Sequence, residues 1–176
     1  MVGLSFVFWM YVILFAIIGG MRGWAKELLV TFSVILALSF STLLEHYVPF
    51  VRDVLQKDNV PLYFWLRAGI LFLLVFFGYQ TPHLARFAAK MTREKFQDIL
   101  LGAFLGAING YLIAGTVWFY MADGGYPFTK VIVPPSGDLA KVAEAMLQYM
   151  PPKLLGIPGI YFAVVVAFIF VIVVFI

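Results

Sequence analysis

The chain has 176 residues, of which 64% are hydrophobic and only 12% are charged, and its mean hydropathy is +1.01. Soluble globular proteins have roughly 45–50% apolar and about 25% charged residues. This composition leaves too little polar surface to cover a water-soluble particle. It excludes a soluble enzyme, a disordered region and a free-standing nucleic-acid-binding domain, so we predict a membrane protein with no nucleic-acid partner. The net charge of +3 suits basic cytoplasmic loops.

Five apolar stretches are long enough to cross a bilayer as helices, which takes roughly 20 residues. They cover residues 3–20, 28–44, 62–78, 99–121 and 159–176. A lone strand cannot satisfy its backbone hydrogen bonds in lipid, so all five are predicted to be helices. No basic residue precedes the first stretch, and we therefore expect it to be a retained span rather than a signal peptide. The predicted fold class is an all-α, multi-pass transmembrane helical bundle with a four-span core and a fifth C-terminal span.

The predicted organisation has three parts: a four-span membrane core over 1–122, an extracytoplasmic segment over 123–158, and the fifth span over 159–176. Within the middle part, apolar residues share one face of a helix predicted over 138–150, which Pro151 and Pro152 end. We expect this helix to rest in the membrane interface or to cap the bundle. A partner bound to its Met-rich face is the alternative.

Basic residues predict the orientation. The connections that follow the first and third spans carry six of them in short segments, while the other side carries five over about twice the length. The prediction is a bacterial inner-membrane protein with its N-terminus outside. Residues 83–97 form either a short basic helix on the cytoplasmic lipid surface or a plain connector. The residues predicted to face lipid headgroups there are Arg86, Lys90, Arg93 and Lys95.

The fourth span carries Gly102, Gly106 and Gly110 at strict intervals of four. Small residues at this spacing let a neighbouring helix approach closely, which favours helix contact in lipid. The first span, with Gly19 and Gly23, is a plausible partner within the chain. Contact between two copies of the chain is the alternative.

Few polar groups fall inside the spans. We expect Asn109 to donate a hydrogen bond between helices, and Arg67 to extend outward from the third span. No acidic residue or histidine is predicted at mid-membrane, which argues against the proton relay of a transporter. Near the predicted cytoplasmic boundary, Arg22 could pair with either Glu27 or Asp98. The sequence has no cysteine and shows no catalytic constellation, so we expect no catalytic residue, metal or cofactor.

Two short elements together resemble the colicin V production protein (CvpA) family over roughly residues 5–122. Residues 20–27, with sequence GMRGWAKE, resemble the family's R-G-aromatic element and its basic–acidic pair. Residues 98–110 resemble its D-x-x-L-G-x-x-x-G-x-x-x-G element. The chain departs from the family at Ile99, where Arg is usual, and at Asn109, where a basic residue is common. We expect both departures to weaken a charge network at this boundary. The motif and packing positions are Arg22, Gly23, Glu27, Asp98, Gly102, Gly106, Asn109 and Gly110.

The resemblance implies a multi-pass inner-membrane protein linked to colicin or toxin export and envelope homeostasis, with no enzymatic activity. A structural or accessory subunit of a larger membrane complex is the alternative, because the last span has a bare Val/Ile/Phe surface. A small channel or transporter is the least favoured reading. The expected partners are membrane lipids and either another membrane protein or further copies of this chain.

Overall fold

A computed structural model describes residues 3–80 and 95–175, and the described chain is helical throughout its regular structure. Its four long helices are α1 (Leu4–Arg22), α2 (Trp24–Tyr47), α4 (Val60–Tyr79) and α6 (Lys95–Asp123). Each is apolar and long enough to cross a membrane, whereas α9 (Gly159–Phe175), which is more apolar still, has 17 residues. The predicted all-α bundle with a C-terminal apolar helix is therefore confirmed.

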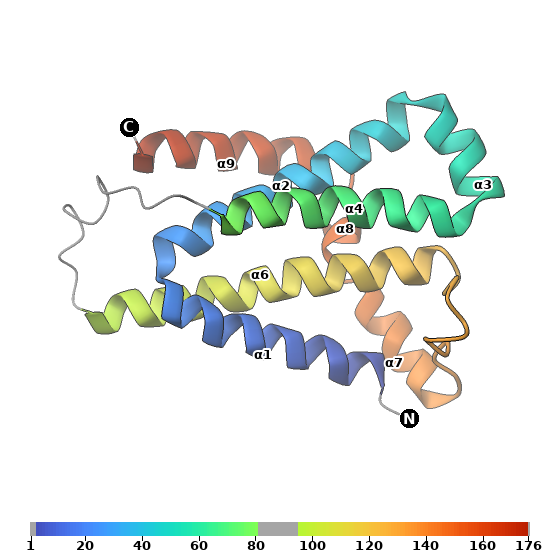
Figure 1. Cartoon of the computed structure of the whole chain (residues 1–176), viewed down its shortest axis with the longest axis horizontal. Coiled ribbons are helices and arrows are strands. Elements are labelled where there is room, and N and C mark those ends of the chain that lie inside the picture. The colour runs from blue at the N-terminus through green and yellow to red at the C-terminus, as the bar shows by residue number, and fades with distance from the viewer. Residues whose placement is uncertain (1–2, 81–94, 176) are drawn as a thin grey trace.

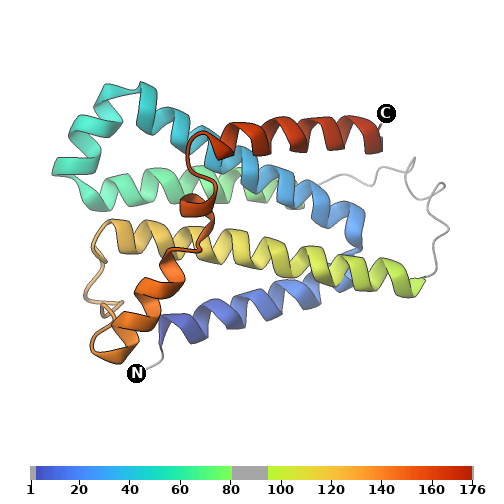
Figure 2. The same cartoon turned by 180° about the vertical axis from the view of Figure 1, so that it is seen from behind.

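The long helices lie side by side, with α6 between α1 and the pair formed by α2 and α4 (Figures 1 and 2). At one end of the bundle, called here the Gly23 end, α1 turns into α2 and α6 begins. At the opposite Asn59 end, α1 begins, α2 connects to α4 and α6 ends. Helix α9 runs along α2 on the side away from α1.

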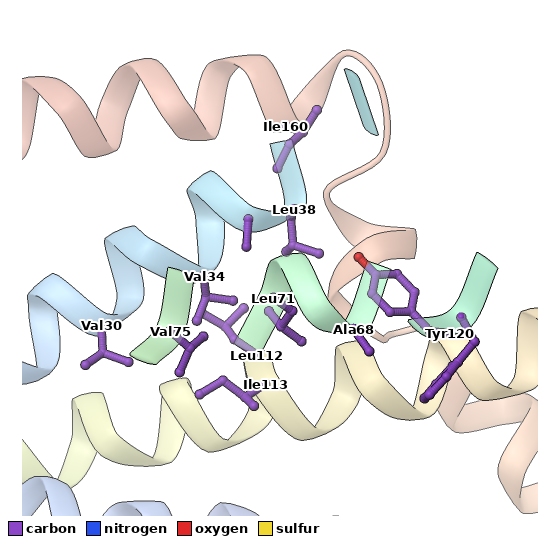
Figure 3. Packing of buried hydrophobic residues seen from close by; sticks show 12 residues of the cluster. Val30, Val34, Leu38, Ala68, Leu71, Val75, Leu112, Ile113, Tyr120 and Ile160 are labelled. Carbon is purple, nitrogen blue, oxygen red and sulfur yellow. The ribbon is translucent and has the colours of Figure 1, made fainter. Parts of the chain in front are cut away.

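The main core is the seam between α2, α4 and α6 (Figure 3). Aliphatic side chains from these helices meet there, and Ile160 from the start of α9 joins them. The helix surfaces that face away from this core are also apolar, and side chains such as Phe77 and Phe104 are exposed on them. Such surfaces are suited to contact with lipid. The labelled core residues in Figure 3 are Val30, Val34, Leu38, Ala68, Leu71, Val75, Leu112, Ile113, Tyr120 and Ile160.

Helix α1 is held mainly through a glycine seam on α6. A Cβ atom added to Gly19 would overlap the Gly102 carbonyl oxygen and lie 2.7 Å from the Gly106 Cα. One added to Gly106 would overlap the carbonyl oxygen of Phe15. The two backbones are therefore in direct contact, so the predicted packing of the first and fourth spans within one chain is confirmed.

The connection at the Asn59 end is a helical turn that the sequence did not predict. A π-helical segment, Phe50–Leu55, leads into the short α3 (Gln56–Asp58). Asn59 then caps α4 by accepting a hydrogen bond from the Leu62 N–H at 3.3 Å. Pro at the first turn of α4 suits this start, since its missing N–H would have no helical partner there.

The segment after α6 returns into the bundle. Helix α7 (Asp138–Leu147) lies at the Asn59 end, where Ala143 packs in a cluster with Phe8 of α1 and Trp118 of α6. The helix predicted over 138–150 thus ends at Leu147. The two prolines do not end it but begin α8 (Pro151–Leu154), because proline is favoured in a first turn.

Helix α8 brings the chain against the side of α6, partway along the bundle (Figure 2). A Cβ atom on Gly115 would lie 2.8 Å from the Met150 Sδ and 2.9 Å from the Pro151 Cδ. Helix α9 starts from this depth, which is why Ile160 reaches the main core.

The glycine seam makes a direct prediction. Gly106→Leu should lower the thermal unfolding midpoint in detergent, because overpacking a tight contact costs roughly 1–3 kcal/mol or more. Phe104→Leu is the matched control on the same helix, since Phe104 is 64% exposed. Equal midpoints for wild type and Gly106→Leu would contradict the seam.

Candidate functional site

The turn between α1 and α2 is built around Gly23 and Asp98. Gly23 has a φ of +85°, a backbone conformation that favours glycine, and an added Cβ would lie 2.8 Å from the Asp98 Oδ2. The Trp24 N–H donates to the Asp98 Oδ1 at 3.2 Å. Asp98, a residue of α6, therefore caps the start of α2 and places a negative charge at the positive end of that helix.

Glu27, in the first turn of α2, is completely buried. Its Oε1 accepts a hydrogen bond from the Arg22 Nη1 at 2.6 Å, and the two groups form an ion pair. The Arg22 Nη2 donates to the carbonyl oxygen of Tyr79 at 3.2 Å, and the guanidinium lies 4.1 Å above the Tyr79 ring centre. Arg22 thus connects α1 with both α2 and the end of α4.

Asn109 of α6 completes the coordination of Glu27. Its Nδ2 donates to the Glu27 Oε2 and to the Glu27 carbonyl oxygen, each at 2.9 Å. Its Oδ1 accepts a hydrogen bond from the Thr31 Oγ1 at 2.7 Å. The predicted role of Asn109 as a hydrogen-bond donor between helices is confirmed. Such bonds between membrane helices contribute about 0.6–2 kcal/mol each.

These residues form one polar junction of α1, α2 and α6, in which Glu27 and Asn109 are buried and Arg22, Thr31 and Asp98 are partly exposed. The structure resolves the choice that the sequence left open, because Arg22 pairs with Glu27, while Asp98 accepts from a backbone N–H instead. We expected the amide at position 109 to weaken a charge network there, but it donates directly to Glu27. The term junction refers below to the residues Arg22, Gly23, Glu27, Thr31, Asp98 and Asn109.

The remaining residues that the sequence predicted for packing or for lipid contact lie outside the junction. Gly102 and Gly106 continue from it along the glycine seam, and Gly110 extends the seam toward Val12 and Phe15. Lys95 begins α6. The predicted lipid-surface residues Arg86, Lys90 and Arg93 lie outside the described residues.

Sequence reasoning missed Thr31 and Tyr79. Thr31 follows Glu27 by four residues, a spacing that places both on one helix face and could have indicated its role. Tyr79 reaches Arg22 only because the end of α4 lies beside the α1–α2 turn, and no local pattern records that proximity.

The expectation for Arg67 was wrong. Its side chain does not extend outward but is buried, with 3% of its surface exposed. It forms ion pairs with Asp123 at 3.0 Å and Glu45 at 3.7 Å. With Glu27 and Arg67 both buried, the described part of the bundle does contain buried ionisable groups, but Glu27 lies in the first turn of α2 rather than at mid-membrane.

The polar groups of the junction bind one another and thereby hold the helices together. Both carboxylate oxygens of Glu27 are hydrogen-bonded, and the positive charge on Arg22 balances its negative charge. Within residues 3–80 and 95–175, no group of three or more His, Asp or Glu side chains is arranged to hold a metal ion.

Comparisons with known proteins agree with the motif resemblance and extend it. Residues 4–150 match the model of the family described as Colicin V production protein. The match passes beyond residue 122, where the resemblance ended, and includes α7. Searches of curated proteins and of solved structures gave no match.

A double-mutant cycle tests the ion pair of the junction. Arg22→Gln should lower the stability of the protein by about 3–5 kcal/mol, because it leaves the buried Glu27 carboxylate unpaired. Adding Glu27→Gln should recover part of this loss, since the double variant buries no unpaired charge. The measurement is thermal unfolding in detergent.

The exposed pair of Arg52 and Asp53, whose side chains are 55% and 45% accessible, provides the matched control. Arg52→Gln should leave the unfolding midpoint nearly unchanged, because an exposed ion pair contributes little to stability. A double variant as unstable as the sum of its single variants would rule out coupling between Arg22 and Glu27.

Proposed function

Because the chain belongs to the colicin V production protein family, we propose that it is a non-enzymatic accessory protein of the bacterial inner membrane that supports colicin or toxin export or envelope homeostasis. The non-enzymatic part of this proposal is supported by the hydrogen bonds within the junction. Its charged and amide groups bind one another and the backbone, so their hydrogen-bonding capacity holds helices together. We assign Arg22, Glu27, Asp98 and Asn109 to positioning rather than to chemistry on a substrate.

The proposed orientation places the Gly23 end in the cytoplasm. Arg22 and Lys26 lie at that end, and the connection between α4 and α6 together with Lys95, the first residue of α6, adds four more basic residues. The Asn59 end, with α7, would then face the outside. In this arrangement α7 covers the extracytoplasmic start of α1.

Complementation tests the proposed function. In a colicin V-producing strain that lacks its own family member, the wild-type chain should restore colicin V secretion. Glu27→Gln and Gly106→Leu should reduce secretion only as far as they reduce the amount of folded protein in the membrane. Phe104→Leu, at a lipid-facing position, should leave secretion unchanged.

The ratio of colicin V secretion to the amount of folded protein distinguishes a positioning role of the junction from a chemical role of Glu27. A constant ratio across the junction variants supports a positioning role. A Glu27→Gln protein that is fully folded and equally abundant, yet inactive, would contradict it and would give the carboxylate a chemical role. Failure of the wild-type chain to restore either secretion or resistance to envelope damage would contradict the accessory function.

A specific observation also favours the alternative of a subunit in a larger membrane complex. Helix α9 packs chiefly on α2, and much of its remaining surface is bare hydrocarbon, including Phe162, Val166 and Val173. Such a face would suit a second membrane protein as well as lipid.

Purification from the native membrane in mild detergent separates these functions. For the accessory protein we expect a small particle containing one or a few copies of the chain. A large particle of fixed composition would instead make the chain a subunit of that complex. A defined ring of identical copies would support a pore between chains, and would replace the accessory proposal by a channel.

A further inference from the structure

A second buried charge lies at the Asn59 end, away from the junction. The Nη1 of Arg67, a buried residue of α4, pairs with the Asp123 carboxylate at 3.0 Å and with the Glu45 carboxylate at 3.7 Å. Asp123 is the last residue of α6, and Glu45 lies in the last turn of α2. One guanidinium therefore connects the ends of two spanning helices to a third. The term Arg67 cluster refers below to Glu45, Arg67 and Asp123.

The cluster holds one negative charge more than it needs. An arginine stays protonated at any pH a protein meets, whereas a carboxylate loses its charge when it binds a proton. A buried charge is tolerated only when an opposite charge pairs with it. Because either carboxylate can pair with Arg67, the cluster can bind one proton and remain paired. A second proton leaves the buried guanidinium without a negative partner.

Protons reach this cluster more readily than they reach the junction. The side chains of Glu45 and Asp123 are 33% and 38% accessible, and both line a cavity of about 180 Å³ between α2, α4, α6 and α8. Glu27 is completely buried, and both of its carboxylate oxygens are hydrogen-bonded. We therefore expect acid to act on the Asn59 end before it acts on the Gly23 end.

The other groups around the cavity leave this charge balance unchanged. Tyr63 of α4 and Tyr120 of α6 line it and place their rings against the Arg67 guanidinium. Helix α8 lines it with a proline and a leucine, α3 with a glutamine, and α9 carries no charged residue. His46, which follows Glu45 in the chain, is exposed. The exposed charged side chains before α4 that pair with one another are Arg52, Asp53 and Lys57.

We propose that the Arg67 cluster is an acid-sensitive switch. With one carboxylate ionised it holds the ends of α2 and α6 against α4, and with both protonated it releases them. The junction and the glycine seam hold the Gly23 end, so the release is confined to the Asn59 end. The proposal goes beyond the accessory function. It relies on the proposed orientation only for the compartment that supplies the acid, which is the extracytoplasmic one.

Single cysteines measure the release, because the chain itself contains no cysteine. Ser41→Cys reports on the Asn59 end, since Ser41 is buried and lines the cavity. Val30→Cys is the matched control on the same helix toward the Gly23 end, where Val30 is completely buried. Met21→Cys, at an exposed residue, gives the rate of an unprotected thiol. The measurement is the rate at which a dipyridyl disulfide, which modifies thiols in acid as well as near neutral pH, reacts with the full chain in mild detergent.

Acid should expose the thiol at the Asn59 end selectively. The rate at Ser41→Cys, relative to that at Met21→Cys, should rise more than about tenfold between about pH 7 and about pH 3, which lie on either side of the ordinary range for carboxyl groups, because a buried charge that loses its partners is strongly destabilising. The relative rate at Val30→Cys should not rise with it.

Charge-removing substitutions in the Ser41→Cys protein locate the switch. Glu45→Gln should leave the thiol protected near neutral pH, because Asp123 still pairs with Arg67. Glu45→Gln combined with Asp123→Asn should expose it near neutral pH, as acid does in the protein with both carboxylates. The controls, which should leave the rate at every pH unchanged, are Asp53→Asn and His46→Gln.

An unchanged rate at Ser41→Cys in acid, or a thiol that stays protected in the double-charge variant near neutral pH, would overturn the proposal. A parallel rise at Val30→Cys would do the same, because it would mean that acid unfolds the whole bundle. If the double-charge variant fails to fold, Glu45→Gln alone decides. Exposure of its thiol near neutral pH would contradict the claim that one carboxylate is sufficient.

Discussion

The buried carboxylate of Glu27 is the constraint on which the rest of the bundle depends. A charge removed from water is tolerated only when it is paired and hydrogen-bonded, and lipid offers no substitute. Arg22 supplies the charge from α1, and Asn109 supplies the amide from α6. Three helices must therefore keep one register. A shift of α6 by one turn would remove Asn109 from Glu27.

The glycine seam requires this same register. Between helices in lipid there is no hydrophobic driving force, so close backbone packing must hold them. Helix α1 buries only Phe8 and Gly19, and it thus relies on contact with Gly102 and Gly106. Asp98 adds a third condition, because it caps α2 only when α6 is at this height. The ion pair, the glycine packing and the helix cap all require the same register of α1, α2 and α6. Together they therefore specify the fold more strictly than any one of them would alone.

The sequence predicted what depends on local pattern. Hydropathy located the spans, and the four-residue glycine spacing predicted a close contact of the fourth span, with the first span as one of two candidate partners. The burial of Arg67 was not predictable, because it requires that the ends of α2 and α6 bring Glu45 and Asp123 beside the second turn of α4. The capping of α2 by Asp98 was missed for the same reason. Residue spacing records which side chains share a helix face, but not which helix ends become neighbours.

The two buried charge clusters differ in a way that separates their roles. Around Glu27, both carboxylate oxygens are bonded within the chain, so the cluster is complete by itself. Around Arg67, the Nη1 pairs with Asp123 and Glu45, while the buried Nε and Nη2 have no acceptor among the described residues. A group needed only to join helices gains nothing from an unpaired edge, since buried donors without acceptors are unfavourable. The cluster around Arg67 is therefore less completely satisfied within the described chain than the junction around Glu27.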